Sequence, residues 1–458
     1  MTPRVGVATA EVFSGGILPD RPELGPVDVL VDRGRILAVE AAGTVDAGTR
    51  HELDGAWLLP GFIDAHVHPI HAETLESVGA EAPAGGVTTV LNHFYPRPGE
   101  PLAEAVARAT AVAARAAADH GFHIRLTPDR LTGADPLVDQ LRPLTELRGV
   151  VSVKAFLAHA DPAVMMTSGG LARVLHAASG FGLPVIVHAE PGEVIATLDE
   201  LLGSAGSLAE HDRRRAPDLE AAAVSLAAAT ARATGARLYV AHLSSEPAVD
   251  AVQRAAEAGA RIRGESCTHY MTLDSGASLG SLGRVTPPLR SSASVAAMRT
   301  RATRPGSGID VLASDHCGYD ADEKPLDDFT HAGNGLPGLD SFVPLLLDAA
   351  IGGGWLSPAD VVRLAARGPA ETFGLARKGR IAPGADADLV VVDPAGTTML
   401  LADPPGPATA HSPYAGRRLR GAVHHVVRRG VGLVWEGEDT EAAATSGGIP
   451  VERTEPRW

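Results

Sequence analysis

The sequence predicts an α/β protein: a (β/α)8 TIM barrel with a smaller β-sandwich domain built from both chain ends. Residues 60–375 alternate short β-prone runs with alanine-rich helical stretches, which is typical of a parallel sheet covered by helices. Eight such β-prone runs occur, and eight is the strand number of this barrel. Residues 1–59 and 376–458 instead contain short β-branched runs broken by glycine and aspartate, a pattern that favours hairpins.

The two chain ends show similar strand-and-turn patterns. "PVDVLVDRGRILAVEAAG" (26–43) predicts a hairpin, and strands are expected in "GRIAPGADADLVVVDP" (379–394) and "GAVHHVVRRGVGLVWEGE" (421–438). We therefore expect residues 1–59 and 376–458 to form one β-rich domain, into which the barrel of residues 60–375 is inserted.

The eight expected barrel strands follow one another through the middle of the chain. Between them lie helical stretches such as "PLAEAVARATAVAARAAADHG" (101–121). No glycine-rich phosphate loop follows any of the strands, so nucleotide binding is disfavoured. The strand segments are 61–68, 86–94, 122–127, 151–159, 183–190, 237–245, 260–270 and 308–319.

Composition excludes several classes of protein. The formal net charge is −15, which disfavours a nucleic-acid partner. Cys267 and Cys317 are the only cysteines, so no disulfide framework is expected and a reducing cytoplasm is predicted. The first residues, "MTPRVGVATAEVFSGG", lack the apolar core of a signal peptide, and no apolar run is long enough to span a membrane.

Six residues of metal-ligand type follow the expected strands. Catalytic groups of a (β/α)8 barrel lie at the carboxyl ends of its strands. A histidine at a strand end can also serve only as a hydrogen-bonding residue of a loop. Because six such residues would converge at one mouth, a metal site is the favoured interpretation. The six are His66, His68, Lys154, His188, His242 and Asp315.

The residue types indicate which ions would bind. Imidazole and carboxylate suit zinc and similar divalent ions, and four histidines with one aspartate suit two ions about 3.5–4 Å apart. A free lysine, with a pKa of about 10.4, would repel cations. If burial removes its proton, Lys154 can react with carbon dioxide to give a carbamate that bridges two ions. The alternative for Lys154 is a salt bridge to Asp315.

These motifs resemble those of the amidohydrolase superfamily, in its binuclear branch with a carboxylated lysine. "GFIDAHVH", "VSVKAF", "VIVHAE", "AHLSS" and "SDHCGY" are similar to its successive metal motifs, and "GRIAPGADADLVVVD" to the strands that follow its barrel. The likeness extends from about residue 25 to about residue 435. Within the branch, "GGVTTVLNHFYPRPGE", "GESCTHYMTL", "VTPPLRS", "SDHCGYDADEK" and "GNGLPGLDSFVPLLL" look most like the hydantoinase and dihydropyrimidinase group, which hydrolyses a ring amide of cyclic ureides.

The resemblance implies a role for each residue. His66 and His68 would hold one divalent ion with Asp315, His188 and His242 would hold the other, and N6-carboxylated Lys154 would bridge the two ions, expected to be zinc. A hydroxide between the ions would attack the ring carbonyl, and Asp315 would carry the proton to the leaving nitrogen. Main-chain groups of Thr286 and Asn334 would hold the ureide edge. The group also implies a homo-oligomer, a tetramer or a dimer.

The chain departs from the group's pattern at one catalytic position. Hydantoinases carry a tyrosine five residues after the bridging lysine, where its hydroxyl stabilises the oxyanion, and here that position is His159. Either His159 takes over this catalytic and substrate-binding role for a ring of different shape, or the change is merely tolerated with weak activity.

Other hydrolases of cyclic amides remain alternatives. Dihydroorotases have an arginine two residues after the histidine pair, where this chain has Ile70, so an acidic ring is disfavoured unless Arg97 or Arg290 substitutes. No residue excludes an allantoinase. A non-catalytic barrel relative is a further alternative, although such relatives lose the metal ligands first.

Four nearby residues have no role in this scheme. His71 and His93 are interpreted as hydrogen-bonding residues of loops, and Cys317 as a small packing residue. For His269, structural and functional roles are both open.

Overall fold

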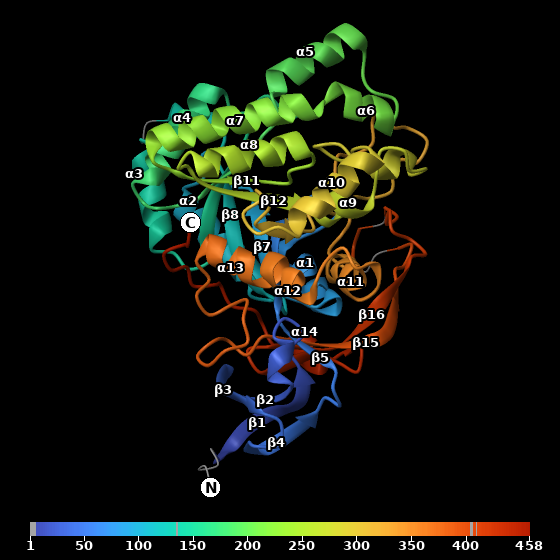
Figure 1. Ribbon diagram of the computed structural model, residues 1–458. Coiled ribbons are helices and arrows are strands. Elements are labelled where there is room, and N and C mark those ends of the chain that lie inside the picture. The colour runs from blue at the N-terminus through green and yellow to red at the C-terminus, as the bar shows by residue number, and fades with distance from the viewer. Residues whose placement is uncertain (1–5, 134–135, 404–405, 409) are drawn as a thin grey trace.

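The computed structural model describes residues 6–133, 136–403, 406–408 and 410–458, and these residues form two nine-stranded sheets (Figure 1). One is the barrel sheet, in which hydrogen-bonded neighbours are parallel. The barrel closes because the last strand is broken into β13 and β14, and β14 pairs with the first barrel strand, His316 opposite Val67. The strands are β6 (Phe62–His68), β7 (Val87–Phe94), β8 (Asp119–Arg125), β9 (Val150–Phe156), β10 (Val185–His188), β11 (Arg237–Val240), β12 (Arg261–Cys267), β13 (Val311–Ala313) and β14 (His316–Cys317).

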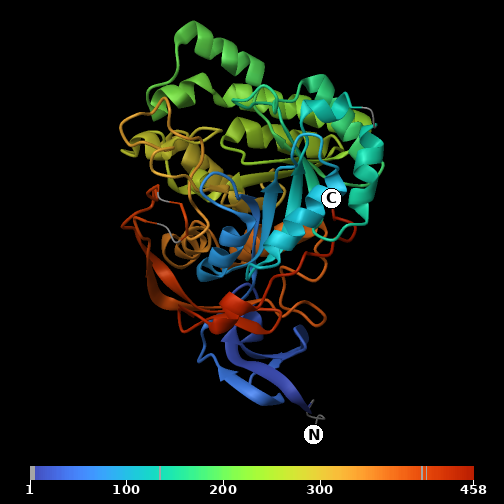
Figure 2. The ribbon, with the colours of Figure 1, turned by 180° about the vertical axis from the view of Figure 1, so that it is seen from behind.

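The helices lie mainly around the outside of this barrel (Figures 1 and 2). The long α7 shows the sequence signals that start and stop a helix. Pro217 occupies its first position, and Gly235, whose φ lies in the left-handed region, follows its last residue. The described α-helices are α1 (Leu75–Glu81), α2 (Leu102–Ala113), α3 (Leu137–Leu141), α4 (Ser168–Ser179), α5 (Gly192–Leu202), α6 (Leu208–Arg214), α7 (Pro217–Thr234), α8 (Glu246–Glu257), α9 (Thr268–Thr272), α10 (Ser292–Ala302), α11 (Phe342–Asp348), α12 (Pro358–Val362), α13 (Gly368–Phe373) and α14 (Glu441–Thr445).

The second sheet is mixed and contains strands from both chain ends. Its centre is the antiparallel pair of β5 and β15, with Pro60 opposite Leu389. The predicted fold class is therefore confirmed. Its strands run in the order β18 (Glu438–Asp439), β17 (Val431–Trp435), β16 (Arg418–Arg428), β15 (Leu389–Met399), β5 (Trp57–Pro60), β1 (Gly6–Ile17), β2 (Pro26–Asp32) and β3 (Arg35–Ala41), with β4 (Asp46–Glu52) also pairing with β1.

Two hairpins of this sheet are closed by an arginine–glycine pair. Arg33 and Gly34 join β2 to β3, and Arg429 and Gly430 join β16 to β17, all four with positive φ. Two successive positive φ values match the turn whose twist suits antiparallel strands. Glycine adopts a positive φ at little cost in conformational free energy, because it has no Cβ.

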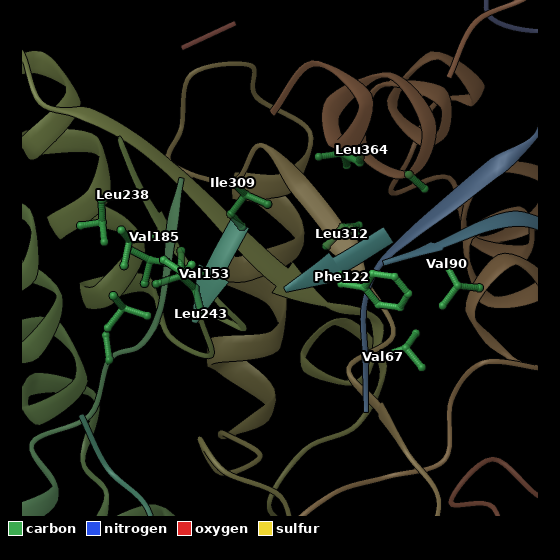
Figure 3. Packing of buried hydrophobic residues seen from close by; sticks show 14 of the residues in the cluster. Val67, Val90, Phe122, Val153, Val185, Leu238, Leu243, Ile309, Leu312 and Leu364 are labelled. Carbon is green, nitrogen blue, oxygen red and sulfur yellow. The ribbon is translucent and has the colours of Figure 1, made fainter. Parts of the chain in front are cut away.

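The barrel strands separate two hydrophobic clusters by alternation. Val185 and Val187 of β10 pack outward against the helices, in the cluster that Figure 3 shows from close by, whereas Ile186 between them faces the barrel interior. Phe373 of α13 and Val451 of the C-terminal segment join this interior cluster. The segment also hydrogen-bonds to the barrel, with the Val451 N–H donating to the His120 carbonyl at 2.9 Å.

A buried ionic cluster connects the barrel to the second sheet. The Lys378 ammonium lies 2.6 Å from Asp119 at the start of β8 and 2.7 Å from Asp388 just before β15. Asp386 lies 3.3 Å from the same nitrogen. We call Lys378, Asp119, Asp386 and Asp388 the basal cluster. The ammonium is joined by Arg35 and Arg377 beside Asp386 and by Arg429 beside Asp119, so the three carboxylates are neutralised and the cluster is a structural group, not a cation site.

Two element boundaries differ from the sequence prediction. The helix expected over 101–121 ends at Ala113, because Asp119 has to begin β8 to reach the basal cluster. The strand expected over 379–394 begins only at Leu389, since glycines at 379 and 384 with positive φ turn the chain before it. None of the described helices combines the length and apolar character needed to cross a membrane.

Candidate active site

A cavity of about 750 Å³ opens at the carboxyl ends of the barrel strands. His68, His188, His242 and Asp315 line it, together with His159, Thr286 and Asn334 of the sequence prediction. His66 and Lys154 are fully buried beneath it. The structure thus brings all the predicted site residues to one end of the barrel.

His66, His68 and Asp315 form one group at this mouth. Strand alternation places His66 and His68 on one face and Val67 on the other, and a bulge between Asp64 and Val67 makes the histidine face the inner one, although Ile63 and Ala65 before it also face inward. His66 Nε2 lies 3.0 Å from His68 Nε2 and 3.2 Å from Asp315 Oδ1. Asp315 has a φ of 52°, in the left-handed region, and interrupts the last strand between β13 and β14. Such backbone strain is typical of functional sites.

His188 and His242 form a second group beside the first. His188 Nδ1 lies 3.0 Å from His242 Nε2, and the His66 and His242 rings are 5.4 Å apart between centroids. His242 also has a left-handed φ, 39°. On its other side, His188 Nε2 contacts the carboxylate of Glu190 at 2.8 Å. This contact assigns the proton to Nε2 and leaves the Nδ1 lone pair facing His242.

Lys154 is close enough to both groups to influence them electrostatically, and its amine has no hydrogen-bond partner among the described residues. Its charge is among the influences that lower the pKa of both His66 and His242, after burial itself. Burial lowers the pKa of Lys154 to about 8. At neutral pH a fraction of this amine is therefore uncharged and nucleophilic. The alternative salt bridge to Asp315 is not formed among the described residues.

Glu265 of β12 organises both groups, although the sequence analysis did not select it. Its Oε1 lies 2.6 Å from His66 Nδ1 and accepts a hydrogen bond from the backbone N–H of His242 at 3.0 Å. Its Oε2 accepts a hydrogen bond from the Tyr239 hydroxyl at 2.6 Å. Burial raises its pKa to about 8, so an ionised Glu265 requires positive charge nearby. When ionised, Glu265 accepts a hydrogen bond from the Nδ1–H of His66. This keeps the proton of the neutral ring on Nδ1, so the lone pair is on Nε2, which faces His68 and Asp315.

This geometry fits divalent cations. The first group brings two imidazole nitrogens and a carboxylate oxygen to within about 3 Å of one another, and the second brings His188 Nδ1 to 3.0 Å from His242 Nε2, so each presents converging atoms of the kind that ligate a divalent cation. The buried Lys154 amine and His242 Nδ1 have no hydrogen-bond partner among the described residues. The donor set contains imidazole and carboxylate, which suits borderline divalent ions such as zinc.

His159 is exposed on the cavity wall, at the position of the missing tyrosine. Its Nδ1 accepts the backbone N–H of Asp161 at 3.0 Å. An acceptor at Nδ1 places the proton of the neutral ring on Nε2, so that Nε2–H is the remaining donor. Although part of the side chain is exposed, desolvation at the cavity wall, followed by the charge of His188, lowers the pKa of His159 and so favours its neutral form.

Lys324 holds the two segments that carry Thr286 and Asn334. Its buried ammonium donates to the carbonyl oxygens of Gly333 and Gly335 at 2.9 and 2.6 Å, on both sides of Asn334. It also donates to the carbonyl of Arg284, two residues before Thr286, at 2.9 Å. These bonds fix the main chain of both segments relative to each other.

The structure also places three histidines that lie outside the predicted set of site residues. The interpretation of His93 as a loop residue is wrong, because it is buried in β7, both ring nitrogens lack hydrogen bonds among the described residues, and its ring stacks 4.5 Å from that of His68. His71 does contact a loop residue, Glu323, at 3.2 Å. His269 lies with Cys267 and Asp315 in a buried group able to hold a cation.

Residues 57–432 match the profile of the amidohydrolase family. The chain belongs to the amidohydrolase family. A curated relative, the D-hydantoinase of Streptomyces coelicolor, is 32% identical over 462 residues, covering 95% of this chain and 96% of the relative. The dihydroorotase of Halobacterium salinarum is 35% identical over 377 residues, covering 80% of this chain and 84% of the relative.

The solved structures of amidohydrolases extend this similarity to the fold. The D-hydantoinase (dihydropyrimidinase) from Thermus sp. superposes with a TM-score of 0.86 at 27% identity, covering 97% of this chain and all of the other. The predicted resemblance to the hydantoinase and dihydropyrimidinase group is confirmed. The six residues selected from the sequence therefore lie at the mouth of an amidohydrolase barrel.

Proposed function

We propose that this amidohydrolase opens a cyclic ureide, of the hydantoin or dihydropyrimidine type, by hydrolysing a ring amide bond. One observation supports the proposal most strongly: two groups of converging imidazole nitrogens lie near the Lys154 amine, which has no hydrogen-bond partner among the described residues, at the floor of a cavity of about 750 Å³. The similarity to D-hydantoinases and a dihydropyrimidinase gives the class of ring.

The proposal includes two divalent ions, with zinc the expected metal. His66, His68 and Asp315 would hold one ion, His188 and His242 the other, and a carboxylated Lys154 both. When bound, such ions polarise a carbonyl oxygen and lower the pKa of a water molecule between them from 15.7 to about 7.

Asp315 is the proposed proton carrier. Its carboxylate faces His66 and His68 at the cavity floor, where it would take the proton of the attacking water and deliver it to the leaving ring nitrogen. The left-handed backbone at Asp315 holds the carboxylate at this point, between two short strand segments.

The other chain groups would orient the ring and stabilise the transition state. His159 lines the cavity, and its Nε2–H would donate a hydrogen bond to the oxyanion that develops on the ring carbonyl. Main-chain groups of Thr286 and Asn334 would hold the ureide edge, with Lys324 fixing both segments.

Ring-opening assays test this function directly. Metal-loaded protein is incubated with hydantoins, dihydropyrimidines, dihydroorotate and allantoin, and the N-carbamoyl products are measured. We expect turnover of a hydantoin or dihydropyrimidine, its loss on chelation, and loss in Asp315→Asn. Failure of the metal-loaded wild type to open any ring would refute the proposal and favour a non-catalytic barrel. Preferential opening of allantoin would replace it with an allantoinase.

The state of Lys154 has a separate test. Native mass measurement at neutral pH should show one added carbon dioxide per chain together with two metal ions. Lys154→Ala should lose activity, and added short-chain carboxylates should restore part of it by supplying the missing bridge. Wild-type protein with two ions and an unmodified lysine would exclude carboxylation.

Assembly and location complete the proposal. A homo-oligomer, a tetramer or a dimer, is expected from the similarity to the hydantoinase group, and the cytoplasm from the low cysteine content. Light scattering at micromolar concentration distinguishes an oligomer from a monomer.

A further inference from the structure

Three arginines line the active-site cavity, and two of them are engaged by the protein. Arg215 contacts the carboxylate of Glu190 at 2.7 Å. Arg284 donates to three backbone carbonyls within residues 329–332 at 2.8, 2.6 and 2.6 Å. Among the residues that the structure describes, Arg125 has neither an ion pair nor a side-chain hydrogen bond.

Arg125 is directed at the reaction centre by strand geometry. It is the last residue of β8 and lies opposite Lys154 of β9, so both side chains leave their strands on the inner face of the barrel. Its neighbours Ile124 and Leu126 pack outward. The free guanidinium is therefore at the same level of the barrel as the proposed metal-bridging residue.

An aromatic ring fixes Arg125 close to the metal-ligand group. The guanidinium carbon lies 4.5 Å from the centroid of the Tyr95 ring, and the Tyr95 hydroxyl contacts His68 Nδ1. A cation stacked on a ring keeps its edge N–H groups available for an acceptor. Tyr95 is thus the only residue between the Arg125 guanidinium and His68, a proposed metal ligand, in this chain of contacts.

The cation is not neutralised from the protein side. Asp129 and Asp161 are near enough to influence its pKa, but neither forms an ion pair with it, and the Asp161 carboxylate accepts the Ala163 N–H at 2.9 Å. Burial lowers the pKa of the half-buried Arg125, so the nearby acidic groups offset the desolvation of its charge only in part. A bound anion would supply the remaining compensation.

We propose that Arg125 binds a carboxylate carried by the substrate, so that the preferred substrates are cyclic ureides with an acidic substituent. This inference rests on the proposed ring-opening function and narrows its substrate class. A carboxylate matches the planar fork of a guanidinium, which can donate two parallel N–H bonds.

The two arginines considered from the sequence do not serve this role. Arg97 is exposed and is not among the residues that line the cavity. Arg290 is buried and engaged by Asp212 and Glu220 at 2.8 and 3.1 Å. Arg125 lies inside the predicted strand 122–127, where the sequence alone does not show whether a side chain faces inward.

Matched substrates and variants test the inference. Hydantoin-5-acetic acid, its neutral amide hydantoin-5-acetamide and unsubstituted hydantoin are compared in metal-loaded wild type, Arg125→Met and Arg97→Met. We expect wild-type kcat/KM to favour the acid over the amide by about 10- to 100-fold, mainly through KM. Arg125→Met should remove this preference and keep turnover of the two neutral rings, whereas Arg97→Met should behave as wild type.

Binding of the open products provides a readout independent of turnover. Calorimetry compares N-carbamoyl-aspartate with N-carbamoyl-asparagine, which differ only in the side-chain carboxylate. Wild type should bind the aspartate compound about 10- to 100-fold more tightly, and Arg125→Met should bind the two equally.

The possible results distinguish a failure of the Arg125 inference from a failure of the proposed ring-opening function. Wild type that opens neutral rings without preferring the acid, or Arg125→Met that loses activity equally on all three rings, refutes the role of Arg125 in selectivity but leaves the ring-opening function intact. In the second case Arg125 would only support Tyr95. Wild type that opens no ring and binds no product refutes both.

Discussion

Replacement of Lys378 by methionine should lower the free energy of unfolding by about 3–5 kcal/mol, the typical effect of removing one partner from a buried ion pair. Three carboxylates surround this ammonium, but two of them keep another cationic partner after its removal, so we expect the loss for one unpaired carboxylate and not for three. Asp386 keeps two arginines, at 3.2 and 3.3 Å, and Asp119 keeps Arg429 at 3.2 Å. Asp388 alone would lose its cation, retaining a backbone N–H bond at 2.8 Å.

The pH dependence of this loss identifies Asp388 as its source. Burial raises the pKa of Asp388 already in the wild type, and removal of Lys378 raises it further. A carboxyl with a raised folded pKa destabilises the fold above that pKa and not below its unfolded value of about 3.9. The difference between variant and wild type should therefore be largest at neutral pH and shrink as the pH falls toward 4.

Denaturant unfolding measured from pH 5 to 8 is the assay, with the first transition compared if the two sheets unfold separately. Lys378→Met/Asp388→Asn should recover part of the loss. The matched control is Arg115→Met, which removes an equally short but exposed ion pair to Glu76, at 2.6 Å, and should cost less than about 1 kcal/mol. A Lys378→Met effect below that of the control, or one independent of pH, would refute the reasoning.

Three further predictions concern the active site. His159→Ala should lower kcat on the best ring by about 10²–10³ if its Nε2–H stabilises the oxyanion, and His159→Tyr should favour simple hydantoins over that ring. Glu265→Gln keeps the shape but removes the charge that polarises His66, so metal affinity measured against a chelator should fall about 10- to 100-fold. Lys324→Met should raise KM by about 10- to 100-fold with kcat less affected, because the three carbonyls it holds carry the ureide-binding main chain.

Each of these has a matched control or a contradicting result. His176→Ala, on the exposed face of α4, should leave kcat unchanged, and wild-type turnover in His159→Ala would remove the catalytic role. Glu257→Gln, exposed in α8, should keep metal affinity, and an equal affinity in Glu265→Gln would contradict the polarising role. An unchanged KM in folded Lys324→Met would show that the two segments hold themselves.

The order of residues along the chain is enough to predict candidate ligands at strand ends, because the strand ends of a parallel barrel must meet at one mouth. That rule selected His66, Lys154 and Asp315 without any tertiary contact. It could not select Glu265, which lies inside a strand and acquires its role only from the His66 and Tyr239 side chains that reach it.

Strand alternation explains the other omissions. The bulge in β6 changes which side chains face inward, and such an irregularity leaves no signal in a pattern of apolar residues. Because the sequence does not show which side chains of a strand face inward, it did not predict that Arg125 lines the cavity or that His93 stacks against His68. The helix expected over 101–121 was too long, because the sequence does not show that Asp119 must reach Lys378.

Lys154, Lys324 and Lys378 are the only lysines of the chain, and all three are buried. An amine-reactive reagent therefore meets no exposed lysine on the native fold, and each modification requires a local opening. The three positions lie in different regions: the barrel mouth, the segments beside Asn334 and the basal cluster. Labelling followed by peptide mass analysis would time the opening of each region separately, so the chain contains three reporters of its own local unfolding.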